Sequence, residues 1–137
     1  MLPLFIGVAV IAIAITFIIV AVNATPKIDQ IPTRHQVVTT ALPLAEVVHA
    51  LRGLVGQHKY RFALEDPQRQ VFVFEDDVSM WSYGAFYPCF IVANPDGGTQ
   101  ITVGLQTKAP QWGPIPKRQL KKITDIVVGA VQGTVSS

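Results

Sequence analysis

The sequence predicts an α+β protein: one N-terminal transmembrane helix, then a β-α-β-β-β-β-α domain with an antiparallel sheet and two helices on one face. Two observations support this fold class. The chain opens with an uncharged apolar run from Leu2 to Val22, and all its charged residues lie after Pro26. Beyond that point, short β-branched segments alternate with two stretches of helical period. We therefore expect a membrane anchor over residues 1–25, a linker over 26–35 and one small domain over 36–137.

The opening run, LPLFIGVAVIAIAITFIIVAV, has a polar side chain only at Thr16. As a helix it would reach roughly 32 Å, which matches a hydrocarbon core of about 30 Å. Backbone groups inside lipid must be satisfied within the segment, so a helix is expected. Small residues would let other membrane helices pack closely against it; they are Gly7, Ala9, Ala12 and Ala14.

A cleaved signal peptide is the alternative, since Val22 and Ala24 are small. The run is longer than the roughly 7–15 residues of a signal core, and no basic residue precedes it, so a retained anchor is favoured. Lys27 and Arg34 follow the run closely, which places the C-terminal domain in the cytoplasm by the positive-inside rule. Many N-terminal anchors leave a large domain outside, so the other orientation stays open.

The elements of the domain follow from local patterns. Strands are expected over residues 36–40, 60–64, 70–75, 86–93 and 99–107. Asn94-Pro-Asp-Gly-Gly98 joins the last two as a hairpin. One helix begins at Pro43. A second begins near Pro116, and Gly133 with the serine tail ends it. The apolar stripes expected to face the sheet are Leu44, Val47, Val48, Leu51, Leu54 and Val55 in the first helix, and Leu120, Ile123, Val127, Ala130 and Val131 in the second.

Several of these segments are similar to a bacterial family of uncharacterised small α+β domains, often tethered to membranes. The likeness lies in Pro43-Leu-Ala-Glu-Val-Val, Glu65-Asp-Pro before a strand, Trp81-x-x-Gly84 and the closing basic helix. It covers residues 36–132. The resemblance implies a sheet-and-two-helix layout like that of helix-grip domains, which hold apolar ligands. It implies no reaction.

No residue pattern points to catalysis. Glu46 and His49 have a carboxylate-metal spacing, but such sites need matching ligands from other helices, and no second copy exists. The lone Cys89 is most simply a small buried apolar residue. Phosphate loops and nucleophile elbows are missing, so we expect no enzyme, metal or cofactor. The net charge of +2 gives no reason to expect nucleic acid.

Two surfaces are candidates for binding. Aromatic residues are enriched in interface cores; those considered for partner binding are Trp81, Tyr83, Phe86, Tyr87 and Trp112. The alternative is that they fill the domain core. A basic cluster at the start of the last helix could meet anionic lipid headgroups or an acidic partner; it comprises Lys117, Arg118, Lys121 and Lys122. The alternative there is an ordinary solvated face.

These features predict a non-catalytic single-pass accessory subunit. It would dock on and stabilise a larger membrane protein complex, for example a respiratory or photosynthetic assembly. Its partners would be other membrane subunits and the bilayer. The alternative is a membrane-tethered domain that binds a lipid or another apolar ligand in a closed cavity between sheet and helices.

Overall fold

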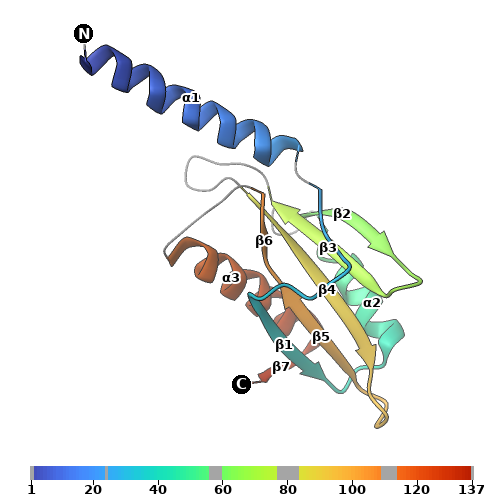
Figure 1. The fold of residues 1–137 in the computed structure, drawn as a ribbon. Coiled ribbons are helices and arrows are strands. Elements are labelled where there is room, and N and C mark those ends of the chain that lie inside the picture. Colours follow the sequence, from blue (N-terminus) through green and yellow to red (C-terminus); the bar gives the residue numbers. More distant parts are fainter. Residues whose placement is uncertain (1, 24, 56–59, 77–83, 109–113, 137) are drawn as a thin grey trace.

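The computed structural model describes residues 2–23, 25–55, 60–76, 84–108 and 114–136, and within the first helix the side chains of residues 6–16. The predicted α+β class is confirmed (Figure 1). The elements in chain order are α1 (Leu2–Asn23), β1 (His35–Thr40), α2 (Leu44–Arg52), β2 (Arg61–Asp66), β3 (Val71–Asp76), β4 (Ala85–Ala93), β5 (Thr99–Gly104), β6 (Gln106–Thr107), α3 (Pro114–Val131) and β7 (Thr134–Ser136).

The strands form one antiparallel sheet in the order β2-β3-β4-β5-β1-β7, with the short β6 paired to β4. The Asn94–Gly98 segment joins β4 and β5 as predicted. Its turn is closed by the Gly97 N–H donating to the Asn94 carbonyl at 3.1 Å, and Gly97 has a φ of +92° that favours glycine. Strand β1 then pairs with β5, which places the start of the domain next to the edge strand β7.

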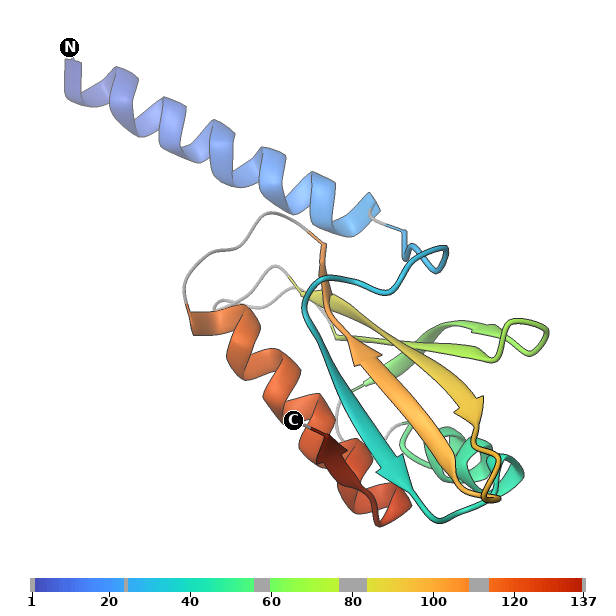
Figure 2. The same ribbon diagram turned by 60° about the horizontal axis from the view of Figure 1, so that its bottom comes forward.

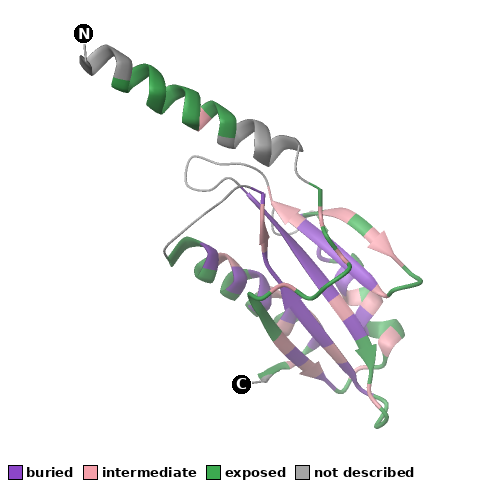
Figure 3. Ribbon diagram, in the orientation of Figure 1, coloured by how far each residue is buried: buried purple, intermediate pink, exposed green. Residues whose placement is uncertain are grey.

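Helices α2 and α3 cover the same face of the sheet, as predicted (Figures 1 and 2). Alternate strand residues point into the layer between them, and the central strands are buried along most of their length (Figure 3). The largest fully buried side chains of this core are Val38, Val47, Leu51, Phe74, Tyr87, Ile101, Ile123, Val127 and Val131. Cys89 is 0 % exposed, so the interpretation of this residue as a buried apolar group is confirmed.

Four expectations about boundaries were wrong. Helix α2 ends at Arg52, so Leu54 and Val55 of its expected stripe lie beyond it, and Val55 is 40 % exposed. The single strand over 99–107 is split at Leu105, whose N–H donates to the Arg34 carbonyl at 3.0 Å, so β5 and β6 are separate. Helix α3 begins at Pro114 and not at Pro116. The tail after Gly133 does not simply end the helix. It returns as β7 and pairs with the open edge of β1, where Val38 lies opposite Val135.

The N-terminal run forms the predicted helix, α1. Across the parts of the chain that the structure describes, no helix has the length and apolar character needed to cross a bilayer. The helix itself is therefore confirmed, and its transmembrane role stays a prediction.

A substitution at Gly98 tests how closely the β4–β5 hairpin approaches the end of β1. A Cβ at Gly98 would lie 2.5 Å from the Thr40 carbonyl oxygen, so Gly98→Ala should lower the free energy of unfolding by about 1–3 kcal/mol. Gly129→Ala is the matched control. A Cβ there meets nothing within 4 Å, and an alanine in a helix should raise the stability by up to about 1 kcal/mol. Chemical denaturation measures both; equal effects would contradict the close approach.

Candidate functional site

Helix α1 exposes apolar side chains on all sides. Its described turns stand clear of the sheet and of the other helices (Figure 3). Large aliphatic side chains that are 51–60 % exposed are Ile6, Val8, Val10, Ile11, Ile13 and Ile15. The small residues predicted for helix packing are exposed at Gly7, Ala9 and Ala12 and half-buried at Ala14. Soluble proteins rarely leave so continuous an apolar surface uncovered, and such surfaces are typical of binding sites.

Residues 25–34, here called the strap, lie across the sheet face opposite the helices (Figure 2). The Lys27 backbone N–H donates to Oε1 of Gln106 at 2.9 Å, and the Gln106 amide donates back to the Lys27 carbonyl. Ile28 packs on a second apolar cluster that contains Val73 and Phe86, both on the outer face of the sheet. The strap therefore covers part of the sheet face opposite α2 and α3.

The strap is held at two further points. Asp29 forms an ion pair with Arg69 at 3.1 Å. Pro32 lies against Gly104, where a Cβ would come within 2.8 Å of the proline ring. Gly104 thus leaves room for the strap to cross β5 closely. The strap is a docked part of the domain, and it begins beside β6, so α1 joins the domain at that end (Figure 1).

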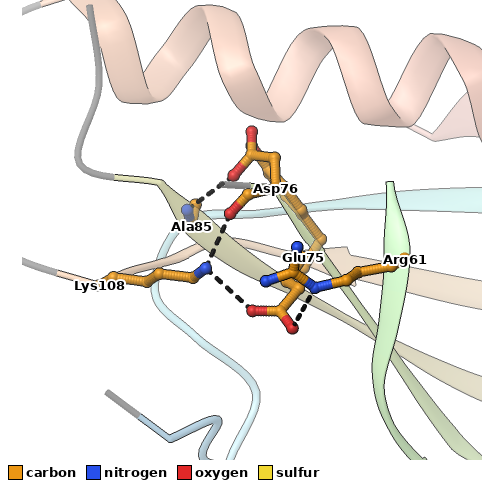
Figure 4. Close-up of polar contacts among 6 residues, drawn as sticks. Arg61, Glu75, Asp76, Ala85 and Lys108 are labelled. Carbon is orange, nitrogen blue, oxygen red and sulfur yellow. Dashed lines mark hydrogen bonds and ion pairs between the residues drawn. The ribbon is translucent and has the colours of Figure 1, made fainter. Parts of the chain in front are cut away.

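A buried polar cluster lies at the same end of the sheet, where β2, β3, β4 and β6 meet (Figure 4). The Lys108 ammonium lies 2.9 Å from Glu75 Oε2 and donates to the Asp76 carbonyl at 2.8 Å. Arg61 Nε donates to Glu75 Oε1 at 2.9 Å. The Lys108 ammonium also lies 5.1 Å from the centroid of the Phe86 ring, within reach of a cation–π contact.

The Asp76 carboxylate accepts two hydrogen bonds in this cluster. The Ala85 backbone N–H donates to Oδ1 at 2.7 Å, and the Tyr87 hydroxyl donates to Oδ2 at 2.8 Å. Burial raises the pKa of Asp76, and these two bonds with the Lys108 charge offset part of that effect. Burial and the Asp76 charge raise the pKa of Tyr60 to about 12 and raise that of Tyr87 as well.

The pKa of Glu75 shifts in the opposite direction from that of Asp76. Burial alone would raise its pKa, but hydrogen bonds and charge from Lys108 and Arg61 outweigh it and hold the pKa below the ordinary value. Lys108 and Arg61 thus both pair with Glu75, whereas the Asp76 carboxylate is held by the Ala85 N–H and the Tyr87 hydroxyl. The cluster joins the ends of β3, β4 and β6.

The sequence patterns do not predict this cluster. Asp76 and Lys108 each follow directly after an expected strand, over residues 70–75 and 99–107. The available signal was the row Glu75-Asp76-Asp77 after a fully apolar strand, because carboxylates beside a buried strand call for cationic partners.

The aromatic residues predicted to bind a partner divide into two groups. Phe86 is 4 % and Tyr87 is 0 % exposed, so both belong to the interior and the contact-surface prediction is wrong for them. Tyr87 lies edge-on to Tyr60 at 5.5 Å between ring centroids. Trp81, Tyr83 and Trp112 lie outside the described residues.

The predicted basic cluster is exposed on the first turns of α3, at Lys117, Arg118, Lys121 and Lys122. Lys121 forms an ion pair with Asp125 at 3.0 Å. Glu46 and His49 are both exposed on α2. The part of the chain that the structure describes contains no group of three or more His, Cys, Asp or Glu residues placed to hold a metal ion.

Two open grooves lie outside the core. One, of about 1110 Å³, runs between the strap and β6 and is lined by Lys27, Ile31, Phe86 and Gln106 among others. The second, of about 540 Å³, lies between α2 and α3 beside Ala50, Gly53 and Gly129. Both are on the surface, whereas the apolar-ligand alternative needs a cavity in the layer that the core side chains fill.

Comparison with protein-family models and with curated proteins finds no match to this chain. The likeness to small membrane-tethered α+β domains therefore stays a prediction.

Substitution of Lys108 measures how much the buried cluster contributes to the free energy of unfolding. Lys108→Met should lower the free energy of unfolding by about 3 kcal/mol, because it leaves the Asp76 carbonyl and one oxygen of the mostly buried Glu75 without a donor. Lys121→Met removes an ion pair of similar length whose side chains are 76 % and 61 % exposed, and it should change stability by less than about 0.5 kcal/mol. Denaturant unfolding of both variants measures the difference. Equal losses of stability would contradict the prediction, because they would show that the buried ion pair contributes no more than the exposed one.

Asp76 gives a pH test with a defined sign. Its folded pKa is raised, so its contribution to stability is complete below the ordinary value of 3.8 and is lost as pH rises through the folded value. Asp76→Asn keeps a carbonyl acceptor for Ala85 and removes this titration. The stability of the variant relative to the parent should therefore increase between about pH 3 and about pH 7. A relative stability that falls over this range would mean that the pKa of Asp76 is lowered.

Proposed function

We propose that this chain is a non-catalytic, single-pass membrane subunit whose α1 packs among other membrane helices and whose domain docks on a larger membrane complex. The observation that carries the proposal is α1 itself. It is a helix of 22 residues without a charged side chain, and its described aliphatic residues are exposed on every side. Such a surface is stable in lipid or against apolar partners and is unfavourable in water.

The domain supports the non-catalytic part of the proposal. Lys108 and Arg61 pair with Glu75, and the described histidines, His35 and His49, are exposed, whereas Cys89 is buried in the sheet core. Burial raises the pKa of the Cys89 thiol to about 12, so the thiolate needed for nucleophilic attack is not accessible near neutral pH.

The orientation is also part of the proposal. Lys27 and Arg34 are exposed just after α1, which favours the cytoplasmic side for the domain. Membrane-tethered binding of an apolar ligand is the second candidate. The only support for it among the described residues is the open groove beside the strap, where Ile31 and Phe86 supply apolar surface.

Alkaline carbonate extraction of membranes from the native host tests the anchor. The full chain should stay in the pellet. The double variant Ile11→Asp, Ile13→Asp should move to the supernatant, because each carboxylate near the centre of a span costs about 3 kcal/mol. Val92→Asp is the control, since Val92 is 56 % exposed on the domain and its change should leave the chain in the pellet.

The same membranes, dissolved in mild detergent, test the complex. The chain should migrate well above its own mass, and Gly7→Leu with Ala14→Leu should reduce that size by blocking close helix approach. Ile6→Leu with Ile13→Leu is the matched control at neighbouring positions. A parent chain extracted by carbonate would contradict the anchor, and a parent chain that migrates as a lone monomer would contradict the accessory role.

A further inference from the structure

The first turns of α3 expose four basic side chains opposite the core. Pro116, Leu120 and Ile123 are buried against the sheet. The exposed side carries Lys117, Arg118, Lys121 and Lys122, with Ile115 beside them at 39 % exposure. We call these five residues the basic face. Among the described residues, only Lys121 of the four cations has a carboxylate partner, Asp125.

Local energetics disfavour this arrangement. Lys117 with Lys121 and Arg118 with Lys122 are like charges at i,i+4 spacing, which repel each other on a helix surface. Lys117 and Arg118 also lie at the first turn of α3, where the helix dipole favours anions. No acidic residue stands in the first turn to offset them. An anionic surface outside the chain would relieve both effects.

The position of the basic face indicates which surface that is. The strap starts beside β6 through the Lys27–Gln106 hydrogen bonds, so α1 joins the domain at this end. The N-terminal end of α3 lies at the same end of the domain, whereas its C-terminal end packs beside β7 and β1 at the other (Figures 1 and 2). Because the strap is docked on the sheet, the domain cannot turn this end away from the point where α1 leaves it.

We propose that the basic face binds the anionic lipid headgroups of the leaflet through which α1 leaves the bilayer. The inference rests on the proposed membrane anchor and adds a lipid class and a binding surface to it. Cations attracted to an anionic leaflet and an exposed isoleucine that can enter the interface are the chemistry of peripheral membrane contact. None of the residues of the basic face lines either groove, which suits a broad charged surface better than a single bound molecule.

The experiment uses the full chain in vesicles of phosphatidylcholine alone or with about 30 mol% phosphatidylglycerol. A nitroxide attached at Ile115→Cys reports collisions with a water-soluble nickel chelate. Cys89 is buried and does not compete for the label. Since each basic residue near an anionic leaflet raises membrane contact about fivefold, the collision rate should fall at least threefold with the anionic lipid. About 1 M NaCl should restore it, because the Debye length shrinks to about 3 Å.

Two variants distinguish an effect of the positive charges from an effect on folding. With Lys117, Arg118, Lys121 and Lys122 all changed to Gln, the label should stay accessible in both vesicles. The control Lys117→Arg, Lys121→Arg, Lys122→Arg keeps the charge and should keep the protection. Both should retain the circular dichroism spectrum of the parent.

The outcomes are distinguishable. A chain that fails to float with vesicles of either composition overturns the anchor and this inference together. A chain that floats with both, but whose label collides equally in both, overturns the lipid contact alone. Protection that appears only when an acidic protein subunit is added, and not with phosphatidylglycerol, also overturns it and assigns the basic face to a protein partner.

Discussion

The uncovered apolar surface of α1 is the constraint on which the proposed function depends. The large aliphatic side chains in its described turns are 51–60 % exposed, and the run contains no charged residue that water could solvate. A helix of this length is marginal alone in water, whereas lipid removes the apolar side chains from water and makes the internal hydrogen bonds obligatory. Membrane and partner helices are the two environments that satisfy this constraint.

The strap fixes the position of the domain relative to the C-terminal end of α1. A proline-containing linker could have let the domain turn freely, but Ile28, Asp29 and Pro32 each contact the outer face of the sheet. The same end of the sheet carries the buried Lys108–Glu75 pair, which joins the ends of the strands there. Elements that share this end, including the first turns of α3, therefore keep a fixed relation to the point where the chain enters the domain after α1.

Local patterns were sufficient to predict much of the fold. The apolar run, the two amphipathic helices and the Asn94–Gly98 hairpin are encoded within short windows, and all of them form. Non-local contacts explain the errors. Strand β7 exists because β1 presents an open edge, and three residues carry no periodic signal. The break at Leu105 exists because its N–H bonds to Arg34 on a distant segment.

The candidate site was predictable to a smaller degree. The exposure of the basic residues on α3 followed from helical period, whereas the burial of Lys108 depends on Glu75 and Asp76 from another strand. Phe86 and Tyr87 were weighed as either core or contact surface. Their strand places Phe86 on the outer face under Ile28 and Tyr87 on the inner face, so both are buried for different reasons.

Amide hydrogen exchange of the full chain in lipid nanodiscs tests the central claim most directly. If α1 is held in the bilayer, its backbone amides should exchange at least about a thousandfold more slowly than those of the exposed β4–β5 turn. Exchange of the α1 amides as fast as that of the turn would contradict the membrane anchor, because a helix surrounded by water at this length opens and closes rapidly.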